Sequence, residues 1–181
     1  MENINQKISY HIVETKPQKL FEFQEVKDYL RVVQSHDDKL IVNIISAAIS
    51  AAENFTGFSL CPKVIKLTCS NHKIVEIILK YRPLLEILKI YILENSPHQL
   101  TNEQYSVDIE RGILFIKTPL QFQNDLVVEY LVGLYEEDVP KAIKQGILLH
   151  IAEMYDREQS VREGLSYEVK NLYLPYRRIK I

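Results

Sequence analysis

The chain has 181 residues, of which 46% are hydrophobic and 25% are charged, and its net charge is −2. This length allows one domain whose hydrophobic core needs no disulfide or metal to hold it. The balance of 22 Lys and Arg against 24 Asp and Glu shows no basic excess of the kind that marks a nucleic-acid-binding surface. Trp is absent and aliphatic residues are abundant, so we expect an aliphatic core with Tyr and Phe as its large side chains.

Cysteine usage and the chain start favour a protein of the cytoplasm. Cys61 and Cys69 form no CxxC pair, so we expect free thiols in a reducing compartment. The first residues show no basic stretch followed by an apolar one, as a signal peptide would. Uninterrupted apolar runs also stay well below the roughly 18 residues that a membrane span needs. We therefore expect no membrane association.

The N-terminal segment contains one alternating stretch and one helical stretch. Residues 8–13 alternate in polarity, which predicts either an edge strand or an arm that pairs only in an assembly. Lys16 and Pro17 then break the chain. Residues 21–33 have apolar side chains at helical spacing and predict a first helix.

A second helix is predicted over about residues 36–55, ending at Gly57. Ser35 and Asp38 have the spacing of a capping box at its start. Its apolar stripe is wider than a one-sided surface helix requires. Two interpretations follow: a central core helix, or a helix buried on one side by its own domain and on the other by a neighbouring subunit. The candidate subunit-interface residues are Ile41, Ile45, Ile49 and Ala52.

Between residues 62 and 132 the pattern changes to that of strands. Residues 64–70, 73–80 and 126–132 are β-rich, and Arg111-Gly112 separates two further short runs in the form of a tight hairpin. Residues 84–93 also suit a helix by spacing, but the preceding Pro83 and the Ile and Tyr content favour a strand. We expect a small antiparallel β section here.

The C-terminal part contains one long helix and a tail. Asp138 and Pro140 suit the start of a helix that extends to about residue 159. Pro175 predicts an extended tail over residues 173–181. The fold class is therefore α+β: two N-terminal helices (within 21–56) and one C-terminal helix (139–159) form a helical core, with the β section (62–132) inserted. We treat residues 1–172 as one domain.

The sequence shows no GxGxxG, P-loop or GxSxG motif. His150 and Glu153 lie one helical turn apart, which is the minimum for a metal or acid–base pair, but further ligands are missing. The pair Asp37-Asp38 precedes a predicted helix, where carboxylates act as caps and dipole partners. We expect no catalytic centre, no cofactor and no metal.

Several segments, taken in order, resemble the head–tail connector (adaptor) family of tailed phages, typified by the connector of phage HK97. Glu25–Val32 and His36–Ile41 resemble its opening helices, and Ala47–Gly57 resembles the end of its second helix. The later matching segments are Tyr81–Leu84, Tyr105–Asp108, Val128–Gly133, Asp138–Leu149, Tyr155–Glu158 and Leu174–Arg178. The resemblance covers about residue 20 to the C-terminus and includes adaptors of gene transfer agents.

This resemblance implies a structural protein that forms a homo-oligomeric ring, usually of twelve subunits, beneath the portal protein. Such a ring extends the DNA channel without reading DNA sequence and offers a platform for the next neck (stopper) protein. It would assemble in the bacterial cytoplasm and remain in the phage or phage-like particle. The helices would form the ring, and the tail would reach the portal through Leu174, Pro175, Tyr176, Arg177 and Arg178.

Other interpretations of these residues remain open. The chain could be another neck or tail-completion protein with a similar helical core. It could also be a small enzyme with a site near His150, Glu153 and the Asp37-Asp38 pair, which predicts a deep polar pocket. The tail could pack on its own domain or lack order, and its basic residues could hold a phosphate. The adaptor predicts exposed apolar helix surface and a projecting tail.

Overall fold

The protein is described by a computed structural model that covers residues 7–70, 75–93, 98–117, 125–156 and 164–177. The chain divides into two compact units. We call residues 1–17 and 61–134 the β unit, and residues 18–60 and 135–181 the helical unit. The range predicted as one domain, residues 1–172, spans parts of both units, and its N-terminal segment belongs to the β unit.

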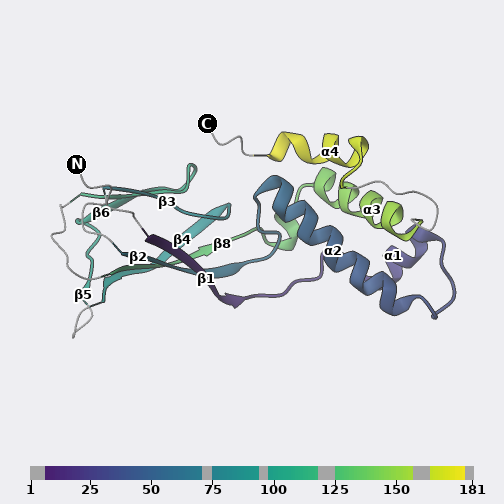
Figure 1. Ribbon diagram of the computed structural model, residues 1–181, viewed down its shortest axis with the longest axis horizontal. Helices are drawn as coiled ribbons and strands as arrows, with labels where there is room; N and C mark the ends of the chain where they lie inside the picture. Colours follow the sequence, from purple (N-terminus) through teal and green to yellow (C-terminus); the bar gives the residue numbers. More distant parts are fainter. Residues whose placement is uncertain (1–6, 71–74, 94–97, 118–124, 157–163, 178–181) are drawn as a thin grey trace. The chain divides into compact units, whose positions relative to one another are not determined.

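The larger sheet of the β unit has five strands in the order β1-β2-β8-β4-β5 (Figure 1). Every neighbouring pair in this sheet is antiparallel. The N-terminal alternation is thus an edge strand that pairs within its own chain. The prediction of a strand over 84–93 is also confirmed. The strands are β1 (Lys7–Thr15), β2 (Lys63–Ser70), β8 (Leu126–Val132), β4 (Leu84–Ile92) and β5 (His98–Gln99).

A second sheet of three strands, β3 (Glu76–Ile78), β7 (Ile113–Ile116) and β6 (Tyr105–Asp108), has the order β3-β7-β6. β6 and β7 form the predicted hairpin, since Gly112 adopts a positive φ of 65° and the Asp108 carboxylate accepts the Arg111 N–H at 2.9 Å.

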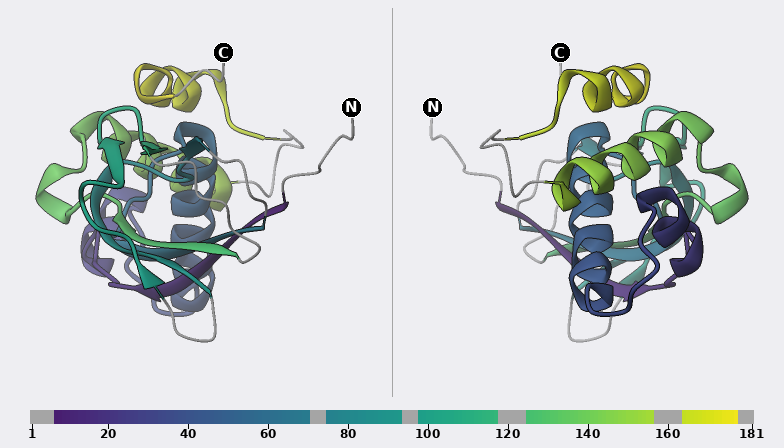
Figure 2. Two further views of the ribbon diagram at one scale, coloured as in Figure 1. Left: turned by 90° about the vertical axis from the view of Figure 1, so that its left-hand side faces the viewer. Right: turned by 90° about the vertical axis from the view of Figure 1, so that its right-hand side faces the viewer.

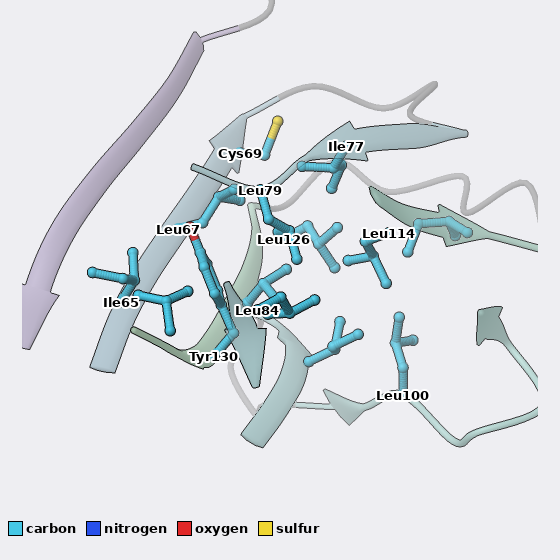
Figure 3. Packing of buried hydrophobic residues seen from close by; sticks show 14 of the residues in the cluster. Ile65, Leu67, Cys69, Ile77, Leu79, Leu84, Leu100, Leu114, Leu126 and Tyr130 are labelled. Carbon is cyan, nitrogen blue, oxygen red and sulfur yellow. The ribbon is translucent and has the colours of Figure 1, made fainter. Parts of the chain in front are cut away.

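Alternation of side chains along the strands creates the core of the β unit. In β2, for example, Ile65, Leu67 and Cys69 are buried while their neighbours are half-buried. Residues from both sheets join one hydrophobic cluster (Figure 3). Two tyrosines add hydrogen bonds within the β unit. The Tyr10 hydroxyl donates to Ile78 O at 3.1 Å, and the Tyr130 hydroxyl donates to Lys80 O at 3.0 Å. The Tyr10 bond fastens β1 to the second sheet.

The helical unit is built on α2, α3 and α4. α3 packs against both α2 and α4 (Figure 2). Its buried aliphatic side chains recur at helical spacing, as the periodicity predicted. None of the described helices is both long and apolar enough to cross a membrane. The helices are α1 (Phe23–Leu30), α2 (Asp38–Thr56), α3 (Lys141–Tyr155) and α4 (Tyr167–Tyr173), with 3-10 turns η1 (Glu136–Asp138) and η3 (Leu174–Tyr176).

The α+β fold class is confirmed, with two local corrections. The predicted capping box does not form: Asp37 is the N-cap of α2 and makes no side-chain cap bond. The tail is not extended over its described part, because α4 runs to Tyr173 and continues into η3. Pro175 lies in the first turn of η3, where a missing N–H costs no helical bond. Ser166 caps α4 by accepting the Val169 N–H at 3.2 Å.

Candidate interaction surfaces

The candidate interface residues on α2 divide into two groups. Ile41 and Ala52 are fully buried within the helical unit, so they have no surface left for a second molecule. Ile45 and Ile49 are half-buried and keep part of their side chains accessible. The sequence pattern does not separate these groups, because a wide apolar stripe does not show which part of it is covered by the protein's own domain.

The exposed side of α2 carries further apolar surface near its N-terminus. Leu40 and Val42 are exposed. Val42 lines a shallow, open depression together with Phe23 of α1 and the polar residues Asp38, Lys39 and Asn43. Its shape does not suit the enclosure of a small substrate. Exposed apolar side chains beside charged ones are a composition common in protein contacts.

A polar cluster holds the start of α2 to its neighbours. The Lys27 ammonium is buried, and it donates to Asp38 Oδ1 at 2.7 Å and to Gln34 O at 2.8 Å. The Asp37 carboxylate accepts the Tyr155 hydroxyl at 2.7 Å, which joins α2 to the end of α3. The two carboxylates therefore have structural partners from α1 and α3. These partners lie far away in the sequence, so the pattern Asp37-Asp38 indicated only a helix cap.

The C-terminal helix is docked by one aromatic side chain. Tyr173 is fully buried, and its ring centre lies 6.0 Å from that of Phe55 on α2. Gly146 of α3 makes room for this ring, because a Cβ at that position would lie 2.5 Å from Tyr173 Cε1. Burial, and then the carboxylate of Glu153, raises the pKa of Tyr173. The phenol is thus held neutral inside the helical unit.

The predicted portal-contact segment follows directly after Tyr173. Leu174 is 56% exposed, and Pro175 and Arg177 are also exposed, whereas Tyr176 is half-buried with its ring centre 6.3 Å from that of Phe58. The segment therefore folds back on the helical unit up to Arg177 and does not project. It still presents an apolar and a cationic side chain outward. Arg178 lies outside the described residues.

The guanidinium of Arg177 lies 4.9 Å from the centre of the Phe55 ring. This distance suits a cation–π contact. Phe55 thereby contacts both Tyr173 and Arg177, so the end of α2 anchors the C-terminal segment from two sides. No sequence motif indicates this docking.

The alternative site near His150 has little support in the geometry. His150 is buried on the same face of α3 as Ile147 and Ile151, and Glu153 is half-buried. Over the described residues, no group of three or more His, Cys, Asp or Glu side chains could hold a metal ion. Asp37 and Asp38 are engaged with Tyr155 and Lys27. These residues do not form a shared polar pocket.

Solved structures share this fold. A chain in the neck of an empty gene transfer agent particle, computed with sixfold symmetry, matches with a TM-score of 0.76 and 15% identity over 96% of this chain and 97% of that chain. A neck chain of the native particle, computed with twelvefold symmetry, gives 0.74 and 15% over 96% and 97%. A chain in the virion of a native gene transfer agent gives 0.73 and 14% over 95% and 96%.

The family of the chain follows from its sequence. Among curated proteins, none matches this sequence. The sequence model of the head completion protein family matches residues 19–170. Because that match covers most of both the helical unit and the β unit, the chain belongs to the head completion protein family.

Proposed function

We propose that this protein is a structural head–tail adaptor subunit and not an enzyme. Several copies form a ring beneath the portal protein, extend the DNA channel and join the head to the next neck protein. The observation that carries this proposal is the family match over residues 19–170. The likeness in fold to neck chains of gene transfer agent particles supports it.

The surface of the helical unit is compatible with assembly. A ring requires two different faces on each subunit, because its contacts are heterologous and close by rotation. The half-buried Ile45 and Ile49 and the exposed Leu40 and Val42 leave apolar surface on α2. A neighbouring subunit would remove this surface from water at about 25 cal/mol per Å² of apolar area.

The portal contact is proposed at the C-terminal segment. Leu174 is exposed on η3 and Arg177 directly after it, and arginine is among the residue types enriched in interface hot spots. Pro175 and Tyr176 complete the described part of the surface, and Arg178, which lies outside the described residues, belongs to the same proposed contact. The matching surface on the portal would combine an apolar hollow with a carboxylate.

A pair of substitutions tests this contact. Deletion of residues 173–181 would also remove the buried Tyr173 and unpack α4, so point substitutions are preferable. Leu174→Asp combined with Arg177→Glu should weaken co-sedimentation with the cognate portal protein by about tenfold or more, as loss of two hot-spot side chains does. Tyr167→Asp, at an exposed position in the first turn of α4, is the matched control and should bind as the unmodified protein does.

Melting temperatures must show that all variants fold. Unchanged portal binding by the double variant would remove the portal assignment from this segment. If the unmodified protein neither binds the portal nor gains mass in light scattering when the portal is added, the adaptor function itself is wrong. Binding to a different neck component instead would identify the chain as another neck or tail-completion protein.

A further inference from the structure

The five-stranded sheet ends in two open edges. On one side, β1 pairs with β2 and has no strand on its outer side among the described residues. On the other side, β5 pairs with β4 only at Tyr91 and Ile92. Within the described part of the chain, the stretch Leu84–Lys89 of β4 therefore has no strand beyond it. Alternate residues of an edge strand point their backbone N–H and C=O groups outward, so each stretch of about six residues offers about three of them for pairing.

The two edges differ in their protection against pairing. The β4 stretch carries Glu86 and Lys89 and two register irregularities against β8, whereas β1 has one irregularity, between Ile12 and Glu14. Natural edge strands are often short or carry lysine and proline. The stretch Ile8–Val13 of β1 contains no Lys, Arg, Asp, Glu or Pro. Ile12 and Val13 at its end are 52% and 59% exposed, and Leu88 on β4 is 39% exposed. Both edges thus combine unpaired backbone with exposed apolar side chains.

The direction of the strands makes the two edges complementary. β1, β2, β8 and β4 are successively antiparallel, so β1 and β4 run in opposite directions. A second copy placed beside β4 in the same orientation, without being turned over, brings its β1 antiparallel to β4. The core-facing side of its sheet then stays on the same side as in the first copy. The contact is heterologous, because one edge meets the other, and such contacts can close into rings.

We propose that β1 of one subunit pairs with the Leu84–Lys89 stretch of β4 in the next subunit, so that the sheets of neighbouring copies become continuous. The occupant of each open edge is a second copy of this chain. This inference rests on the proposed ring, for which it names a subunit contact in the β unit.

The sheet register supplies a direct test by crosslinking. His11, Lys66, Glu129 and Lys89 are successive cross-strand neighbours. The first and last of these residues are therefore separated by three strand spacings, which is about 14 Å. In one subunit, a bis-maleimide shorter than this distance cannot join cysteines at the two ends of the row. Between subunits paired as proposed, the same two positions lie on adjacent strands.

The variant is His11→Cys with Lys89→Cys in a Cys61→Ala background, in which the buried Cys69 is retained. Crosslinking of the assembly on the cognate portal should give a ladder of covalent multimers, from dimers upward. His11→Cys alone and Lys89→Cys alone are the matched controls. Neither can extend a chain of links, so both should stop at the dimer.

Edge substitutions give a second readout. Ile12→Lys and Leu88→Lys each place a charge on one open edge and should weaken ring formation by about tenfold, since buried cross-strand pairs and their ladder bonds are lost. Ile109→Lys, at an exposed position in the turn between β6 and β7, is the control and should assemble normally.

The outcomes separate this inference from the proposed function. Rings that form on the portal without a covalent ladder, and that tolerate both edge substitutions, would overturn the strand pairing and leave the adaptor function in place. If the unmodified protein forms no ring on the portal, the adaptor function and the pairing both fail.

Discussion

The hydroxyl of Tyr173 is buried, and it has no hydrogen-bond partner among the described residues. Leaving a buried polar group unsatisfied costs about 1–3 kcal/mol. Tyr173→Phe removes this oxygen but keeps the ring that packs against Gly146 and Phe55. After an allowance for the small void left by one atom, we expect the free energy of unfolding to rise by about 0.5–2 kcal/mol.

The stability advantage of Tyr173→Phe over the unmodified protein should increase at high pH. The pKa of Tyr173 is raised in the folded state, by burial and then by Glu153. Above the ordinary tyrosine pKa of about 10, the unfolded chain has lost a proton that the folded protein retains. Stability therefore falls as pH rises, by up to about 1.4 kcal/mol per pH unit for this group. Tyr173→Phe has no ionisable hydroxyl at this position, so its stability does not fall with pH for this reason.

Urea denaturation followed by circular dichroism at neutral pH and above pH 10 measures both effects. Burial also raises the pKa values of Tyr10 and Tyr130 in the β unit, but these groups are common to both proteins and cancel in the difference. Tyr155→Phe is the control: its hydroxyl donates to Asp37 at 2.7 Å, so its loss should destabilise the protein by about 1–2 kcal/mol. The claim that the Tyr173 hydroxyl lacks a hydrogen-bond partner would be refuted if Tyr173→Phe were less stable than the unmodified protein and showed the same pH dependence.

Two further substitutions test the packing of the helical unit. Gly146→Ala should lower the free energy of unfolding by up to about 2 kcal/mol in urea denaturation, because a steric cost of about 1–3 kcal/mol against the Tyr173 ring is offset by a helix-propensity gain of about 1 kcal/mol. An increase would show that the ring moves aside freely. Asp38→Ala should cost about 1–3 kcal/mol in the same assay, since the buried Lys27 ammonium loses its 2.7 Å acceptor. A loss no larger than that of Lys39→Ala, a neighbouring exposed lysine, would show that the Lys27–Asp38 pair contributes nothing.

Local sequence patterns were sufficient to predict those helices and strands whose formation depends on their own residues. The spacing of Ile41, Ile44 and Ala48 with Gly57 at the end predicted α2, and it forms over Asp38–Thr56. The β-rich residues 64–70 predicted β2, and Arg111-Gly112 predicted the β6–β7 hairpin. Helical and extended backbones impose periods of 3.6 and 2 residues on their own side chains, so these signals need no tertiary partner.

The amino-acid sequence by itself therefore determined the α+β class, most elements and the resemblance to head–tail connectors. Tertiary structure decided how the ends of the chain are used: β1 joins the inserted sheet through pairing with β2, and α4 docks through Tyr173 on Gly146. It also showed that Ile41 is covered while Ile45 is partly accessible. These outcomes depend on contacts between residues far apart in the chain. A seven-residue helix such as α4 is not stable without such contacts, and its sequence shows no apolar periodicity that predicts it.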